Sequence, residues 1–200
     1  MKKATQIFLY IFHPLLLTTY LTTILSLYIP QYLMLPSSSV RTFIALIFIM
    51  TFVFPLSNIL IFRAFDVKGN YQLKKRQNKI LIIAMTNAIY LVISVLFIFK
   101  VQIGFGRIIS IVTLLGLSAT ALWLLAGISF QALITAGFFG IITAVEVTFE
   151  GLQLLWPIII FALILGGVLS AILYLNKNSL KQAVLGSIIG YSIGFLGIII

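Results

Sequence analysis

The stretch Leu125–Gly140, LAGISFQALITAGFFG, decides how this chain folds, because it lies in the middle of a very long uncharged segment. That segment, Ile108–Val145, has no charged side chain over its 38 positions (108 to 145). One bilayer crossing needs only about 20 apolar residues. The polar residues after Gly127 therefore mark a turn between two crossings, a polar spot inside one long helix, or part of a reaction site.

The composition is that of an integral membrane protein. Hydrophobic residues make up 62% of the 200 residues and charged residues only 8%, with a mean hydropathy of +1.24. A soluble domain is about one-quarter charged, so this chain lacks the polar surface that would keep it in solution. We expect residues 1–200 to form a single transmembrane helical domain. The chain has no cysteine, which excludes disulfides, thiol nucleophiles and thiolate metal sites.

The net charge of +10 does not indicate a nucleic-acid-binding protein. The basic residues fall in short loops between apolar runs, where they set the orientation of the helices and contact anionic lipid headgroups. The amino-terminal MKKATQ resembles the start of a signal peptide. The run that follows, Ile7–Ile29, is too long for a signal peptide and lacks a small-residue cleavage site, so we expect a retained first helix.

The apolar runs predict an all-α, polytopic membrane helix bundle. They are Ile7–Ile29, Thr42–Phe62, Ile80–Phe99, Ile108–Val145, Leu154–Leu175 and Ala183–Ile200. Because the fourth run is long enough for two crossings, we expect about seven transmembrane helices, with six as the alternative.

The charge of the loops favours seven helices, because cytoplasmic loops carry the excess of Lys and Arg. If Gly127 breaks the fourth run, ten basic residues lie on one side of the membrane and three on the other. With six helices the split is only eight to five. The sequence thus predicts a cytoplasmic N-terminus and an external C-terminus. It also predicts that Gly127 lies near the cytoplasmic surface, since a backbone turn in lipid needs shielding.

Prolines and glycines predict where helices bend and meet. Three prolines are expected to kink their helices, and neighbouring helices must then satisfy the freed carbonyls: Pro14, Pro55 and Pro157. Gly186, Gly190 and Gly194 recur every four residues along the last run. This spacing lets two helix backbones approach closely, and we favour a partner helix of the same chain over a second protein.

Few side chains suit acid–base or metal chemistry. His13, the only histidine, is either a proton carrier or ligand, or a neutral imidazole bonded to a backbone carbonyl; we favour the second. Glu146 and Glu150 are four residues apart and face one side of a helix end. We favour a solvated interfacial face for this pair over a carboxylate site. Asp66 is the only other acid, so a metal enzyme is not expected.

The strongest phosphate-binding candidate is the cluster Lys74-Lys75-Arg76. Three cations at a membrane surface attract anionic lipid headgroups, by about 1 kcal/mol each. Their ordinary role in setting membrane topology accounts for the cluster equally well.

Several segments resemble one family of small bacterial membrane proteins. FHPLLLTTY at 12–20, TFVFPL at 51–56 and the loop that ends in the basic cluster are similar to a branch of the phosphatidic acid phosphatase type 2 superfamily. Ile128-Ser129-Phe130-Gln131 occupies the place of that family's I-S-x-H segment. Ala171-Ile172-Leu173-Tyr174-Leu175, followed by Asn178 and Gln182, occupies the place of its A-R-L-x-L segment, histidine and glutamine. Gly186 and Gly190 match the glycines that follow.

The resemblance implies the fold and argues against the reaction. Active members use one histidine to attack phosphorus, a second to protonate the leaving alcohol, and Arg and Lys to hold the phosphate. By that alignment, the acid's position is Gln131, the nucleophile's is Asn178 and a phosphate-binding arginine's is Ile172. An amide neither attacks phosphorus nor titrates near neutral pH, and isoleucine has no donor. Gln77 also replaces the proline that follows the family's basic cluster.

We therefore expect a catalytically degenerate, lipid-phosphatase-like protein of the bacterial cytoplasmic (inner) membrane that is not an enzyme and has no cofactor. It binds anionic membrane lipids or is a subunit of an assembly with other membrane proteins. The expected vestigial headgroup site consists of Lys74, Lys75, Arg76, Gln131, Asn178 and Gln182. The alternatives are an active lipid phosphatase with unusual residues, and a small solute or proton carrier. Candidate polar residues for a carrier pathway are Asn58, Asn87, Thr86 and His13.

Overall fold

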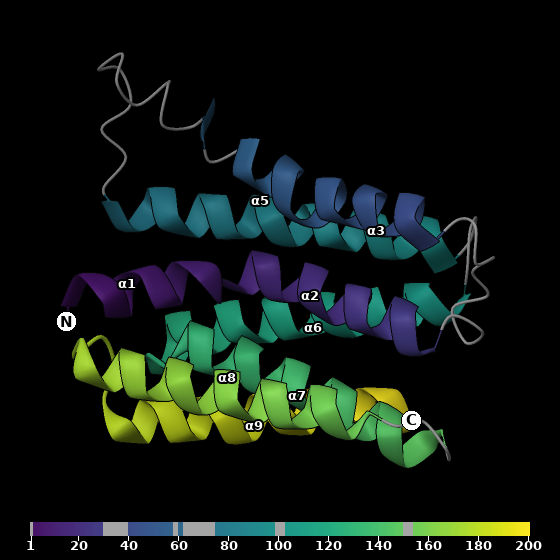
Figure 1. Ribbon diagram of the computed structural model, residues 1–200. Helices are drawn as coiled ribbons and strands as arrows, with labels where there is room; N and C mark the ends of the chain where they lie inside the picture. The colour runs from purple at the N-terminus through teal and green to yellow at the C-terminus, as the bar shows by residue number, and fades with distance from the viewer. Residues whose placement is uncertain (1, 30–39, 58–59, 62–74, 99–102, 150–153) are drawn as a thin grey trace.

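The computed structural model of the protein is a bundle of helices that run alongside one another (Figure 1). It describes residues 2–29, 40–57, 60–61, 75–98, 103–149 and 154–200, and side chains within these ranges except at 75–79 and 103–104. The described helices are α1 (Lys2–Ile11), α2 (Pro14–Tyr28), α3 (Val40–Phe48), the π-helix η2 (Ile49–Val53), α5 (Lys75–Leu96), α6 (Ile103–Ala126), α7 (Phe130–Thr148), α8 (Leu155–Tyr174) and α9 (Leu180–Ile199).

The predicted helical membrane bundle is confirmed, and five or six apolar helices of membrane-spanning length lie within the described residues, against the seven predicted. Five helices are long and apolar enough to cross a membrane: Val40–Ser57, Phe105–Ala126, Phe130–Thr148, Leu155–Tyr174 and Leu180–Ile199. The bent pair α1–α2 adds a sixth if it counts as one span, and the apolar part of α5, Ile80–Leu96, is shorter.

The break expected at Gly127 is present. α6 ends at Ala126 and α7 begins at Phe130. Gly127 has a φ of 65°, in the left-handed region where a residue without a Cβ is favoured. Ser129 then starts α7, because its hydroxyl oxygen accepts a hydrogen bond from Ala132 N at 3.5 Å. A glycine followed two residues later by a serine thus converts one uncharged run into two helices.

The breaks arrange the chain so that four segments meet at one end of the bundle. The amino ends of α1 and α5, the α6–α7 turn and the α8–α9 turn lie together there, and the C-terminus lies at the opposite end (Figure 1). The start of α7 is therefore next to the start of α9, although about fifty positions separate them in the sequence.

α7 is the central helix, and α9 packs directly against its backbone. A Cβ added at Gly190 would overlap the carbonyl of Leu133, and one added at Gly194 would overlap the carbonyl of Gly137. These two glycines lie on the same face of α9 and are buried there. The prediction that the glycine repeat packs within the chain is confirmed, and we call this contact the α7–α9 glycine seam.

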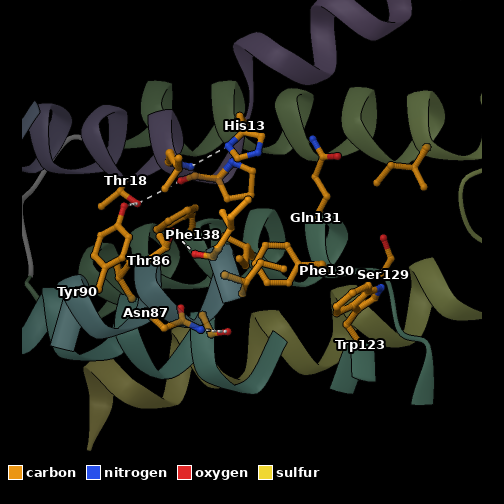
Figure 2. A pocket seen from close by; sticks show the side chains of 18 of the residues that line it. His13, Thr18, Thr86, Asn87, Tyr90, Trp123, Ser129, Phe130, Gln131 and Phe138 are labelled. Atoms are coloured by element: carbon orange, nitrogen blue, oxygen red, sulfur yellow. Dashed lines mark hydrogen bonds between the residues drawn. The ribbon is translucent and has the colours of Figure 1, made fainter. Parts of the chain in front are cut away.

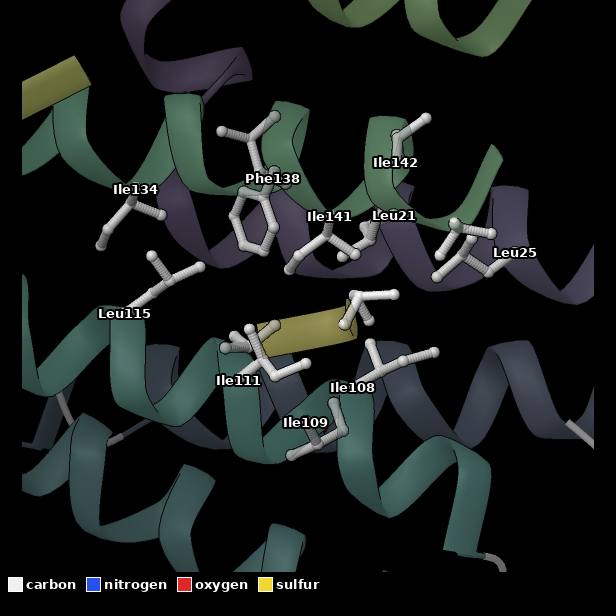
Figure 3. Packing of buried hydrophobic residues seen from close by; sticks show 14 of the residues in the cluster. Leu21, Leu25, Ile108, Ile109, Ile111, Leu115, Ile134, Phe138, Ile141 and Ile142 are labelled. Carbon is white, nitrogen blue, oxygen red and sulfur yellow. The ribbon is translucent and has the colours of Figure 1, made fainter. Parts of the chain in front are cut away.

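The other faces of α7 meet α2 and α6 in an apolar core (Figure 3). Phe138 and Ile141 of α7 pack with Leu21 of α2 and with Ile108 of α6, and all four are fully buried. The core extends through α3, α5, α8 and α9. Phe138 also lines a cavity, so the core forms part of the wall of that cavity.

The bend predicted at Pro14 and the pairing of a freed carbonyl predicted at Pro55 are present. The pair α1–α2 is bent by 51° immediately before Pro14. Pro55 follows η2 and cannot donate to the carbonyl of Thr51, four residues earlier. The hydroxyl of Tyr90 on α5 donates to that carbonyl at 3.1 Å. The prediction for Pro157 is wrong: it lies in the first turn of the continuous helix α8, where a backbone N–H needs no helical partner.

The close contact at the glycine seam predicts that Gly190→Ala, which adds a single methyl group, lowers the stability of the protein. Gly190→Ala places a methyl group against Leu133 O, and the two helices must separate. Such overpacking costs about 1–3 kcal/mol, so thermal unfolding in detergent should shift down by roughly 3–10 °C. The matched control is Gly166→Ala on α8, where an added Cβ meets no atom within 4 Å. Equal melting temperatures for the two variants would contradict the seam.

Candidate functional site

A cavity of about 620 Å³ lies between α2, α5, α6 and α7 at the end where the α6–α7 and α8–α9 turns meet. In Figure 2 the labelled side chains run from Ser129 and Trp123 at one end, past Gln131 and Phe130, to Asn87 and Tyr90 at the other. We call these ends the mouth and the floor. His13 and Lys177 line the cavity and are exposed, so the cavity opens to the surface of the molecule.

The wall of the cavity combines polar and apolar residues. Ser129 lies at the mouth, Gln131 and then His13 follow along the cavity in Figure 2, and Lys177 and Asn178 belong to the same lining. The apolar wall includes Ile82, Ile83, Val112, Ile134 and Phe138, and the polar residues near the floor are Thr18, Thr86, Asn87 and Tyr90. Lys177 is the only lining residue among those described that is charged near neutral pH, and none of them is acidic.

His13 is held by the break between α1 and α2. It is the N-cap of α2, and its Nδ1 accepts a hydrogen bond from Leu15 N at 3.4 Å. While Nδ1 accepts, the hydrogen of the neutral ring is on Nε2, which is then a donor. We expected a neutral ring bonded to a backbone carbonyl; the bonded group is instead a backbone N–H. The structural role is thus a cap, and it leaves Nε2–H for a group in the cavity.

Gln131 of α7 donates a hydrogen bond to a carbonyl that the break between α1 and α2 leaves without its helical partner. In a continuous helix Leu9 O accepts from His13 N, but here His13 N bonds Tyr10 O at 3.3 Å. Gln131 Nε2 donates to the freed Leu9 O at 3.3 Å. An unpaired carbonyl is costly in an apolar surrounding, so this amide has a structural task. Gln131 Nε2 keeps a second hydrogen for a ligand.

The α8–α9 turn is fixed by local hydrogen bonds. Asn176 has a φ of 50°, and Asn176 N and Lys177 N bond the carbonyls of Leu173 and Ile172, which is the Schellman pattern at a helix end. Two residues later a new helix starts. Lys177 and Asn178 are therefore presented by a short, fully bonded turn.

Gln182 is part of the start of α9. Ser179 Oγ accepts from Gln182 N at 3.3 Å, and Gln182 Oε1 accepts from Ser179 N at 3.0 Å, a capping box. Gln182 Oε1 also lies 3.5 Å from Asn178 Nδ2. A Cβ added at Gly127 would lie 3.2 Å from Gln182 Nε2. Gln182 thus joins the two turns, but it does not line the cavity.

The expected headgroup site is brought together in part. Gln131 and Asn178 line one cavity, and so does Ile172, although they lie on different helices or turns. Lys75 and Arg76 lie in the first turn of α5, with side chains outside the described set. Lys74 lies outside the described residues.

Sequence reasoning missed part of the lining. Thr18, Tyr90 and Lys177 face the cavity and had not been singled out as a site, and Ser129 had been noted only as part of the polar segment after Gly127. The spacing of Thr86, Asn87 and Tyr90, one, three and four residues apart, puts them on one side of a helix and was the available signal. Nothing in the sequence connects that side to the α8–α9 turn.

Of the acidic pair, only Glu146 lies within the described residues. Glu146 Oε2 accepts from Leu154 N at 3.1 Å, close to the start of α8, where a carboxylate is favourable. Glu150 lies outside the described residues, and so do Asp66 and Asn58. Among the residues that are described, no three His, Asp or Glu side chains are grouped as metal ligands.

The chain matches no family model, and comparisons with curated proteins and with solved structures give no match either. The cavity and the sequence motifs therefore have to carry the functional interpretation by themselves.

The contact between Gln131 and Leu9 predicts a stability effect. Gln131→Leu leaves the carbonyl of Leu9 without a donor and should lower the free energy of unfolding by about 1–3 kcal/mol. Unfolding in detergent measures the loss. With Pro14→Ala in the background, α1 and α2 can join and His13 N can return to Leu9 O. The cost of Gln131→Leu should then fall by at least half. An unchanged cost would show that the amide does not serve the break.

Proposed function

We propose that this protein binds an anionic membrane lipid in the cavity, with the headgroup at the mouth and a chain along the apolar wall. The observation that carries the proposal is the polarity of the cavity: hydrogen-bond donors and one cation at the mouth, then a wall of apolar side chains. Small-molecule sites in proteins commonly combine a mostly apolar wall with a few polar groups that orient the ligand.

The mouth suits an anion. Lys177 supplies a positive charge, and the amides of Gln131 and Asn178 each keep a hydrogen that no described protein group accepts. His13 adds its Nε2–H when Nδ1 caps α2. A phosphate oxygen accepts such bonds strongly, because charge-assisted bonds are stronger than neutral ones. A carboxylate in the wall would repel the anion, and the described wall has none.

The resemblance to the phosphatidic acid phosphatase type 2 superfamily supports the same ligand class. The three positions that the resemblance assigns to the acid, the nucleophile and the arginine are Gln131, Asn178 and Ile172, and all three face the cavity. Their side chains bind or pack but do not perform phosphoryl transfer. We propose a degenerate member that has kept the place of the site and lost its reaction.

We also propose a membrane topology. Counting α1–α2 as one span and α5 as another gives seven crossings in a bacterial cytoplasmic membrane. The mouth is then on the cytoplasmic side with the N-terminus, and the C-terminus is outside. Lys2, Lys3, Lys177 and Lys181 at one end of the bundle support this orientation under the positive-inside rule.

Two other functions have less support. A carrier needs a path across the bilayer, whereas the described lining on α6 stops at Val112. That residue lies about 16 Å from Trp123 at 1.5 Å per residue, roughly half of a bilayer core. A structural role in a membrane assembly is compatible with lipid binding. No described surface favours a particular protein partner.

Lipid binding is tested with paired lysine variants. Purified protein in a neutral detergent is titrated with dodecyl phosphate, and the fluorescence of Trp123 in the cavity wall reports binding in a Trp156→Phe background. Lys177→Met removes a charge-assisted contact and should weaken binding about tenfold or more. Lys181→Met removes the same charge from α9, outside the lining, and should change the dissociation constant less than threefold.

Three results would count against this site. Equal weakening by the two lysine variants would mean attraction to surface charge alone. No binding of dodecyl phosphate would remove the proposal. Inorganic phosphate, added as a separate arm, should give no signal at the same concentration, and an equal response would point to a phosphate site without a lipid chain.

The loss of catalysis is tested separately. Purified wild-type protein should release no phosphate from phosphatidate or polyprenyl diphosphate above a no-protein control, because an amide replaces each histidine. The triple variant Gln131→His, Ile172→Arg and Asn178→His should release phosphate. The matched double variant, which keeps Asn178, should remain at the background rate. Turnover by the wild-type protein would instead support an active phosphatase with unusual residues.

A further inference from the structure

The polar residues near the floor of the cavity do not fit a ligand that is purely hydrocarbon below its headgroup. Thr18, Thr86, Asn87 and Tyr90 lie in the interior of their helices and line the cavity. An apolar chain laid against unpaired polar atoms leaves those atoms without partners, which is unfavourable. Which of their atoms already have partners decides what the floor can bind.

The side-chain amide of Asn87 has a bonded nitrogen, and its oxygen accepts no hydrogen bond from the described residues. Its Nδ2 donates to Gly116 O at 3.3 Å and to Thr120 Oγ1 at 3.0 Å, so both hydrogens are used. A carbonyl such as Gly116 O can only accept, which fixes the nitrogen on the α6 side. Asn87 is 7% exposed. No residue in the described ranges donates to its Oδ1.

The open oxygen lies beside the cavity wall. A Cβ added at Gly116 would overlap Asn87 Oδ1, and Gly116 itself lines the cavity. The oxygen therefore occupies the space that the missing side chain of Gly116 leaves. In Figure 2 the Asn87 oxygen is directed toward the cavity, while its nitrogen makes the marked hydrogen bond.

The neighbouring hydroxyl groups donate their hydrogens to other groups of the protein, so that only their oxygens can bond a ligand, as acceptors. Thr86 Oγ1 donates to Ile82 O at 2.9 Å, and Thr18 Oγ1 donates to Pro14 O at 3.2 Å. Tyr90 directs its hydroxyl to Thr18 Oγ1 and to Thr51 O, at 3.2 and 3.1 Å. The mouth thus presents donors, and the floor presents acceptors whose own hydrogens are already used within the protein.

We infer that the ligand is an anionic amphiphile with a hydrogen-bond donor, a hydroxyl or an amide N–H, within its apolar part, and that Asn87 Oδ1 accepts from this donor. The inference rests on the proposed lipid binding and narrows it to one class of lipid. Gly116 lies seven residues before Trp123, the α6 residue at the mouth, so the donor is about 10 Å below the mouth at 1.5 Å per residue.

Alkyl phosphates that differ at the far end of the chain test this inference. For each length from octyl to tetradecyl, the plain chain is compared with chains that end in a hydroxyl or in a methoxy group. The methoxy group is polar but cannot donate. We expect the hydroxyl probe to bind about tenfold more tightly than the methoxy probe at one optimal length, because only the hydroxyl satisfies Asn87 Oδ1. The preference should decline at shorter and longer lengths.

The variant Asn87→Leu removes the acceptor and should reduce the hydroxyl-to-methoxy preference to about one, while plain dodecyl phosphate still binds. If this variant does not fold, the length dependence in the wild-type protein remains decisive. Equal binding of hydroxyl and methoxy probes at every length would overturn the inference and leave lipid binding intact. Failure of every probe to bind would overturn the proposed function and this inference together.

Discussion

The α7–α9 glycine seam is the contact on which the rest of the structure depends. Gly190 and Gly194 let the backbone of α9 lie against the carbonyls of α7, at a separation that no larger side chain permits. Because the two helices start at the same end of the bundle, their first turns also meet. Ser129 N lies 3.4 Å from Gln182 O across this contact. The seam thereby brings Gln131 and Asn178 to the mouth of one cavity.

A second constraint comes from the apolar surroundings of broken helices. Each break frees a carbonyl that water cannot reach in a membrane. Gln131 donates to the carbonyl of Leu9, and Tyr90 donates to the carbonyl of Thr51. Both side chains also line the cavity. The polar groups available to a ligand are therefore the remaining hydrogens and lone pairs of residues whose first task is structural, and substitutions there change stability as well as binding.

Under the proposed function, this double use explains how a site persists without its reaction. The turns that present Gln131, Lys177 and Asn178 are built by backbone caps, by Asn176 and by the capping box of Ser179 and Gln182. None of these elements needs a histidine. A cavity with amide donors and an apolar wall is suited to binding, and we propose that it is the degenerate form of a phosphatase site.

The sequence alone determined the helical membrane class, the break at Gly127 and the close-packing face of α9. Each follows from a local sequence pattern: apolar runs, a glycine followed by a capping serine, and glycines every four residues. The kink expected at Pro157 was wrong because its effect depends on where α8 begins, and helix ends are weakly marked in an apolar run. Only the tertiary structure placed Lys177, Asn87 and Tyr90 around one cavity with Gln131. Their proximity depends on how helices pack over long sequence separations, and the apolar pattern of α6, α7, α8 and α9 is similar on all sides.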